Sequence, residues 1–199
     1  VAVDQAPAMG RVERLADVPM GRRLAEVDFE FPLAAGTGAV QAIADLMDVH
    51  LPPEDPMRAY ASVLRELGDP ELRGFLTGSI DGVLGVPVGA DVRYLVVDYK
   101  TNRMGPGDLS ALDYDSASMT AEMIRSHYPL QAMLYAVALH RYLRWRLSDP
   151  QAQDRLGPVL YLFVRGMAGP ETPAGIGVLR WDLPGALVVA LSDLLGGRA

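Results

Sequence analysis

The chain of 199 residues contains no cysteine, which excludes disulfides, thiolate zinc sites, cysteine-ligated iron–sulfur clusters and a cysteine nucleophile. It has no apolar run near the roughly 20 residues that cross a bilayer. It also lacks the basic start and apolar stretch of a secretory signal. We therefore expect a cytoplasmic protein without a membrane segment.

Lysine is almost absent, because 17 arginines accompany the single Lys100. One interpretation is that position 100 needs a compact ammonium group and cannot use a broad guanidinium. The other is codon bias with one chance survivor. Both remain open at this point.

The formal net charge is −7, which is unusual for a protein that binds nucleic acid by itself. If DNA is the substrate, other domains or a partner chain should deliver it. The chain begins at Val1 and not at Met, so we expect a piece of a longer protein.

The apolar pattern predicts an α/β domain with a mixed sheet flanked by helices. We expect a lead-in segment over residues 1–25, a domain over 26–199 and a long loop over 101–118. Strands are predicted at 26–31 (ended by Pro32), 74–86, 92–99, 159–164 and 176–181. Helices are predicted at 40–49, 54–67, 120–125, 129–146 and 183–195.

Two aspartates interrupt consecutive apolar strands that a short loop joins. A carboxylate such as Asp81 or Asp98 is costly in such a run unless it is paired or binds a cation. If the strands pair, both carboxylates converge, and oxygen ligands of this kind suit Mg²⁺. Lys100 lies two residues after Asp98 and should share its face of the strand. The alternative is a pair of exposed aspartates and a simple surface ion pair.

Gln131 and Tyr135 are four residues apart on the longest predicted helix, so they share one face. Both side chains can hydrogen-bond a phosphate. The alternative is a core tyrosine beside a glutamine at the start of a helix.

These segments together resemble the motif series of the RecB-like nucleases in the PD-(D/E)xK superfamily, from about Glu26 to Met167. The resemblance rests on Arg73-Gly74-Phe75-Leu76-Thr77-Gly78-Ser79-Ile80-Asp81, Asp98-Tyr99-Lys100-Thr101-Asn102, His127-Tyr128-Pro129-Leu130-Gln131-Ala132-Met133-Leu134-Tyr135, Ala138-Leu139-His140-Arg141-Tyr142-Leu143 and Tyr161-Leu162-Phe163-Val164-Arg165-Gly166.

The resemblance implies a restriction-endonuclease-like fold and the C-terminal nuclease domain of a helicase-nuclease that acts in recombinational double-strand break repair. It implies a Mg²⁺-dependent exodeoxyribonuclease, with RecC and RecD as partner subunits, RecA as a recombinase partner and DNA as substrate. The implied metal ligands are Asp81, Asp98 and the backbone carbonyl of Tyr99.

The resemblance also implies that Lys100 is the catalytic lysine. It implies that Gln131 and Tyr135 are a pair that supports the site and contacts DNA, and that Glu26 is an acidic residue near the metal. The family also supplies a metal-binding histidine upstream, and no histidine precedes Glu26 here. The missing histidine and the negative charge favour an alternative, a non-catalytic module that docks to RecC and RecA.

The three histidines and a cluster of three arginines are the other basic residues to consider. We expect His50 at a helix end and His140 on the surface, whereas His127 precedes the Gln131 helix and could approach DNA. Three arginines, 141, 144 and 146, suit the negative end of a helix dipole. Contact with phosphate is the alternative.

Overall fold

The computed structural model describes residues 14–68 and 70–197, which divide into two compact units. Unit 1 consists of the described residues up to 27 together with 80–123 and 157–182. Unit 2 consists of the described residues of 28–79, 124–156 and 183 onward. Within the described residues, no helix combines the length and apolar character needed to cross a bilayer.

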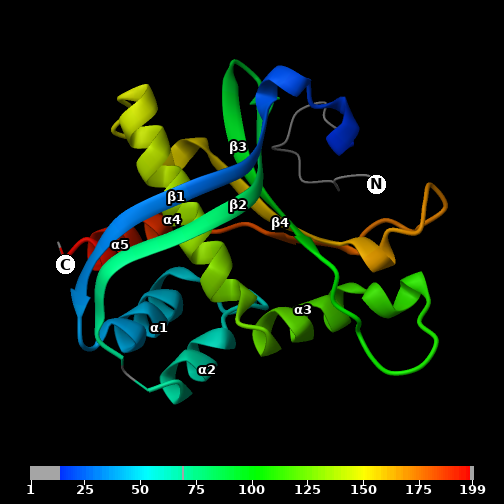
Figure 1. Cartoon of the computed structure of the whole chain (residues 1–199), viewed down its shortest axis with the longest axis horizontal. Helices are drawn as coiled ribbons and strands as arrows, with labels where there is room; N and C mark the ends of the chain where they lie inside the picture. Colours follow the sequence, from blue (N-terminus) through cyan, green and yellow to red (C-terminus); the bar gives the residue numbers. More distant parts are fainter. Residues whose placement is uncertain (1–13, 69, 198–199) are drawn as a thin grey trace. The chain divides into compact units, whose positions relative to one another are not determined.

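Five strands form one mixed sheet in the order β1-β2-β3-β4-β5 (Figure 1). The strands are β1 (Arg23–Gly36), β2 (Leu72–Val88), β3 (Asp91–Lys100), β4 (Leu156–Phe163) and β5 (Val178–Trp181). The helices are α1 (Ala39–His50), α2 (Tyr60–Glu66), α3 (Ser116–Arg125), α4 (Tyr128–Leu147) and α5 (Gly185–Leu195). The prediction of an α/β fold with a mixed sheet flanked by helices is confirmed, and it is consistent with a restriction-endonuclease-like fold.

The core of unit 1 lies on one face of β2, β3 and β4. Strands β2 and β3 are antiparallel and meet at a turn, with Val88 opposite Asp91. Gly89 occupies that turn with a φ of +60°, which a glycine adopts without strain. The buried cluster on this face consists of Val18, Leu84, Val86, Leu95, Val97, Leu160 and Leu162.

Strand β3 is covered on both faces, because residues 95 to 98 are all buried. Residues 1–13 of the predicted lead-in segment (1–25) lie outside the described part. Val18 nevertheless packs in the core, and β1 begins at Arg23.

Strand β1 continues through Pro32 to Gly36, so the prediction that Pro32 ends the strand is wrong. The physical reason is the position of β1 at the edge of the sheet. An edge strand has one side without a partner strand, where a missing N–H costs no ladder hydrogen bond.

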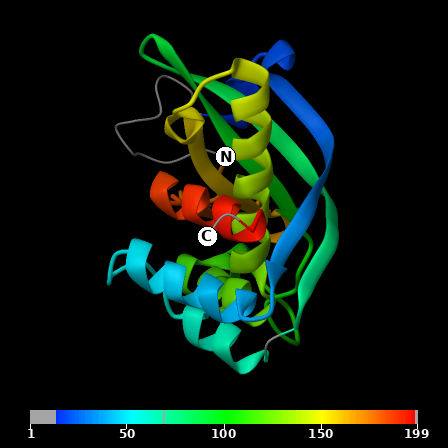
Figure 2. The ribbon, with the colours of Figure 1, turned by 90° about the vertical axis from the view of Figure 1, so that its left-hand side faces the viewer.

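Unit 2 is built around α4, which contacts α5, while α5 in turn contacts α1. Figure 2 shows α5 beside α1 and α4. His140 on α4 is only 1% exposed, so the prediction of a surface histidine is wrong. Burial, followed by the nearby charge of Arg144, lowers the pKa of this histidine. His50 ends α1, as expected.

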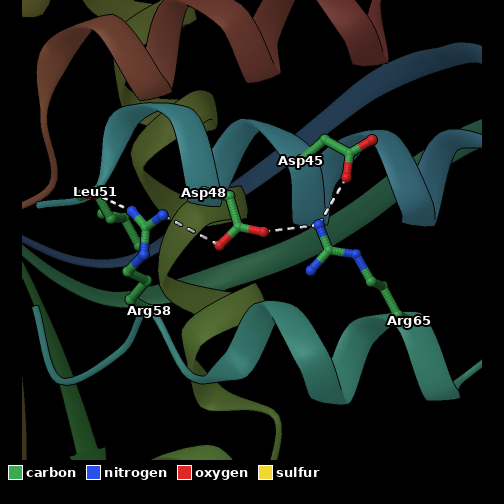
Figure 3. A network of polar contacts seen from close by, with 5 residues as sticks. All are labelled: Asp45, Asp48, Leu51, Arg58 and Arg65. Atoms are coloured by element: carbon green, nitrogen blue, oxygen red, sulfur yellow. Dashed lines mark hydrogen bonds and ion pairs between the residues drawn. The ribbon is translucent and has the colours of Figure 1, made fainter. Parts of the chain in front are cut away.

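An ionic network joins α1 to the segment that follows it (Figure 3). The guanidinium of Arg65 contacts Asp45 at 2.6 Å and Asp48 at 2.7 Å. The other oxygen of Asp48 lies 3.5 Å from Arg58, which also donates to the carbonyl of Leu51. These groups are partly exposed, so the network between α1 and the segment after it adds little stability.

Two helix starts differ from the prediction. Helix α2 begins at Tyr60 and not near residue 54, because the Asp55 carboxylate accepts from the Met57 amide in a local turn. Helix α3 begins at Ser116, inside the predicted loop, because the Asp115 carboxylate accepts from the Ser118 amide at 2.7 Å. That hydrogen bond caps the helix and lowers the pKa of Asp115.

Candidate active site

The two aspartates predicted to converge lie on the paired strands β2 and β3. The register places Gly82 opposite Val97, so the next step along the strands places Asp81 opposite Asp98. Opposite residues of an antiparallel pair project to the same face. Asp98 is only 3% exposed, whereas Asp81 is half-buried. The hairpin therefore holds both carboxylates at one position of the sheet, on the face opposite the cluster that contains Val97.

Lys100 forms a close ion pair with Asp98, and the distance between Nζ and Oδ2 is 2.7 Å. The two side chains are 11% and 4% exposed, so the pair is largely removed from water. The ammonium also lies 5.3 Å from the centroid of the Tyr161 ring on β4, within the range of a cation–π contact. The prediction that Lys100 shares the face of Asp98 is therefore confirmed by geometry.

Asp81 bonds to the neighbouring strand through its side chain. Its Oδ2 accepts a hydrogen bond of 2.8 Å from the backbone amide of Tyr99. The bond orients the carboxylate toward the end of β3, between Asp98 and Lys100 in sequence. The Tyr99 side chain itself is 53% exposed.

The chain that follows Lys100 is fixed at three points. Arg165 donates to the carbonyl of Thr101 at 2.9 Å, and the Tyr114 hydroxyl donates to the carbonyl of Asn102 at 3.0 Å. The Asn102 amide donates at 2.6 Å to Glu122, a carboxylate that is 4% exposed. The catalytic candidate thus precedes an anchored segment and not a free loop.

The sequence analysis missed Glu122 and Tyr114. The signal was present in the sequence, because Glu122 interrupts the apolar face that Met119 and Met123 form on α3. A buried carboxylate on such a face needs a donor, and Asn102 supplies one.

Gly166, in the motif that ends β4, has a steric role next to this anchor. A Cβ at this position would lie 2.5 Å from the Cβ of Tyr114 and 2.9 Å from the Cα of Gly177. The Gly177 amide also donates to the carbonyl of Tyr114 at 2.9 Å. Only glycine lets Tyr114 approach closely enough to keep its place beneath Asn102.

Gln131 and Tyr135 form their own pair in unit 2, where the Gln131 amide donates to the Tyr135 hydroxyl at 2.9 Å. The Tyr135 ring is buried and packs edge-on against Phe29, with 6.0 Å between centroids. Phe29 in turn lies over Gly78, where an added Cβ would be 2.6 Å from the ring. Gly78 therefore leaves space for the Phe29 ring, and that ring positions Tyr135.

His127 precedes α4 and is held by a buried partner. Its Nδ1 lies 2.9 Å from the Tyr60 hydroxyl, and its backbone has a φ of +57°. Burial raises the pKa of Tyr60 to about 12, so this hydroxyl stays protonated. The contact gives His127 a structural role at the start of the Gln131 helix.

Glu26 does not join the two aspartates. It lies on β1 with an exposed side chain, and its φ of +51° is in the left-handed region that non-glycine residues rarely adopt. Among residues 14–68 and 70–197, no group of three or more His, Asp or Glu side chains is arranged to hold a metal ion. The role of Glu26 near a metal stays a prediction.

The donor set of Asp81 and Asp98 still fits a hard divalent cation. Mg²⁺ characteristically binds through one or two carboxylates and takes its other ligands from water and substrate phosphates. Oδ2 of Asp81 accepts from the Tyr99 amide, and Oδ2 of Asp98 pairs with Lys100.

No protein-family model matches the chain. It is 50% identical over 194 residues to the RecBCD enzyme subunit RecB of Mycobacterium tuberculosis (strain H37Rv), covering 91% of this chain and 17% of that protein. It is 46% identical to the RecB subunit of Mycolicibacterium smegmatis, covering 93% of this chain and 18% of the relative. It is 34% identical to the RecB subunit of Escherichia coli K12, covering 96% and 15%.

The similarity covers nearly the whole chain, whereas the chain spans less than a fifth of each of these relatives. The matched region includes both the β2–β3 hairpin and the start of α4. On this similarity, the chain belongs to the RecB family.

Proposed function

We propose that this chain is a Mg²⁺-dependent DNA nuclease domain of a RecB subunit, and that it hydrolyses phosphodiester bonds during double-strand break repair by recombination. The observation that carries the proposal is the meeting of Asp81, Asp98 and Lys100 at one position of the sheet. Exodeoxyribonuclease activity, RecC and RecD as neighbouring subunits and RecA as a further partner belong to the same proposal. It rests on the relatives' shared name and on the motif residues.

The residues divide the chemistry as follows. Asp81 and Asp98, with the Tyr99 carbonyl, would hold Mg²⁺, which when bound supplies Lewis-acid stabilisation of phosphoryl oxygens. Lys100 places a positive charge where negative charge builds as water attacks phosphorus. Asp98 fixes the direction of that ammonium, because the ion pair of 2.7 Å is formed before any substrate arrives.

Gln131 and Tyr135 would position the DNA strand. Their side chains are hydrogen-bonded to each other, and Tyr135 is locked by Phe29, so the pair needs little ordering to bind a phosphate.

The test is cleavage of single-stranded DNA with Mg²⁺ by the chain and by its Asp98→Asn variant. The matched control is Asp182→Asn, which changes an exposed aspartate of the same unit. We expect Asp98→Asn to lose at least about a hundred-fold in rate, the loss typical of removing one preorganised electrostatic group. The Asp182 variant should cut normally. Equal rates for wild type and Asp98→Asn, or no cleavage by wild type, would refute the proposal.

A second candidate function is docking to RecC and RecA without catalysis. The net charge of −7 favours it. A pull-down with the Asp98→Asn protein separates the two functions. Capture of either protein by a chain that never cuts DNA would favour docking alone.

A further inference from the structure

The last turns of α4 carry an exposed aromatic and cationic surface. Trp145 is 75% exposed and Tyr142 is 42% exposed, and their ring centroids are 6.1 Å apart. Leu143 is the buried residue between them and anchors this end of the helix to the core. Figures 1 and 2 show α4 as the longest helix, with its C-terminal turns in yellow.

The cations of this surface lie on the same two turns. Arg144 and Arg146 are exposed, and neither forms a salt bridge with any residue that the structure describes. Arg141 is held in place, because it donates to the Ser192 hydroxyl at 3.0 Å and to the Ser192 carbonyl at 2.7 Å. Its guanidinium also stacks over Phe31 at 4.3 Å from the ring centroid.

A surface hollow of about 520 Å³ lies beside these groups, lined among others by Arg141, Arg144, Trp145 and Pro32. Its size is that of a small-molecule site. Part of its wall is preorganised by the contacts of Arg141 with α5, so little entropy is lost when a ligand enters.

The helix dipole explains only part of this arrangement. Arginines in the last turn do suit the negative end of a helix. An indole adds nothing to that effect, yet Trp145 leaves a large apolar face in water. Alternating aromatic rings and guanidinium groups are the pattern that binds single-stranded nucleic acid, by stacking on bases and pairing with phosphates. The pattern is local, because the chain as a whole carries a charge of −7.

We infer that residues 141–146 of α4 form a binding surface for single-stranded DNA, separate from the Gln131 pair on the same helix. Trp145 stacks on a base, and Arg144 and Arg146 neutralise the adjoining phosphates. Trp145 lies 14 residues after Gln131 on one helix, which corresponds to about 20 Å at the α-helical rise. The surface would therefore hold a DNA strand well away from the Gln131 pair. Binding of DNA to this surface does not depend on cleavage of the DNA.

The two tryptophans make a direct test possible. Trp181 is 3% exposed and out of reach of a base, so quenching of tryptophan emission by a short oligothymidylate reports on Trp145. Titrations are run in EDTA, so that binding is measured without cleavage. We expect saturable quenching, and a ten-fold or greater loss of affinity in Trp145→Ala, at about the lower limit for one stacked base. Affinities of the variants are read from the anisotropy of a labelled oligothymidylate.

The arginines have their own signature. Arg144→Gln with Arg146→Gln should lower the slope of log affinity against log salt by about 1.4, since each neutralised phosphate contributes about 0.7 on a single strand. The control is Phe75→Ala, which removes an exposed ring from β2 in the same unit and should change neither affinity nor slope. Far-ultraviolet circular dichroism confirms that each variant keeps its helix content.

Three outcomes overturn the inference. If DNA binds without quenching the emission of Trp145, it binds elsewhere on the protein. If Trp145→Ala binds DNA with the same affinity as the wild type, the DNA also binds elsewhere. Quenching by polyglutamate but not by oligothymidylate assigns the surface to an acidic protein partner. Nuclease activity is scored separately, so loss of quenching in an active protein refutes this surface alone, whereas quenching in an inactive protein refutes only the proposed function.

Discussion

Replacing Lys100 with methionine should destabilise unit 1 strongly, because it leaves the Asp98 carboxylate buried without its ammonium partner. The pair is 2.7 Å apart, and its side chains are 11% and 4% exposed. At an effective dielectric constant of about 20, the gross attraction at this distance is about 6 kcal/mol. Desolvation opposes most of that gain, but removal of one partner of a buried pair typically costs about 3–5 kcal/mol.

A double-mutant cycle isolates the interaction. Lys100→Met and Asp98→Asn should each be destabilising, and the double variant should cost less than their sum by about 3 kcal/mol, because both charges leave together. In a chain of this length, the loss of about 3–5 kcal/mol expected for the lysine variant alone lowers the melting temperature by roughly 6–20 °C. The control cycle is the more exposed pair Arg180 and Asp182 in the same unit. Its coupling should stay within about 1 kcal/mol.

The assay is urea unfolding in a Trp145→Phe background, where Trp181 is the remaining tryptophan. Trp181 lies on β5 within unit 1, so its emission reports on the unit that holds the pair. A coupling energy below about 0.5 kcal/mol, the level of an exposed pair, would refute the placement of Lys100 and Asp98 together in a water-poor site.

Three smaller predictions use urea unfolding followed by far-ultraviolet circular dichroism, which reports on both units. Burial lowers the pKa of His140, so its contribution to the free energy of unfolding should be complete above the unfolded pKa of about 6.5 and fall as the pH drops below that value. His140→Phe should flatten the dependence of the free energy of unfolding on pH between about pH 7 and pH 5. An unchanged dependence on pH would contradict this prediction. Asn102→Ala removes a donor from the buried Glu122 and should cost about 2 kcal/mol; a cost near zero would show that this bond does not anchor the segment. Gly78→Ala should cost about 1–3 kcal/mol by displacing Phe29, and no loss would mean that the ring moves freely.

The β2–β3 hairpin and the placement of its charged side chains could be predicted from sequence because two local rules act together. Apolar strands interrupted by Asp81 and Asp98 signal costly carboxylates, and the spacing of Asp98 and Lys100 fixes a common face. Both rules are local. The two strands are joined by a short turn at Gly89, so their pairing does not depend on contacts between distant parts of the sequence. The resemblance then supplied the roles that spacing alone leaves open.

Other features depend on tertiary context that no local pattern encodes. Pro32 continues a strand because β1 is at the edge of the sheet, and strand order is not visible in the residues around it. His140 looks like a surface residue beside Arg141 until α5 covers that side of α4. Glu122 and Asn102 are 20 residues apart, so their hydrogen bond becomes visible only when α3 is placed against the end of β3.

The scarcity of lysine gains a physical meaning from the site. None of the described arginines is buried, whereas the ammonium of Lys100 is mostly removed from water between Asp98 and the Tyr161 ring. A guanidinium is wider and planar, and it presents a fork of donors, whereas the ion pair here is made to a single carboxylate oxygen. Codon preference accounts for the arginines on the surface, but it does not account for the one position where the preference is broken. At that position a compact ammonium lies between a carboxylate and a ring face, so the exception favours the catalytic role proposed for Lys100.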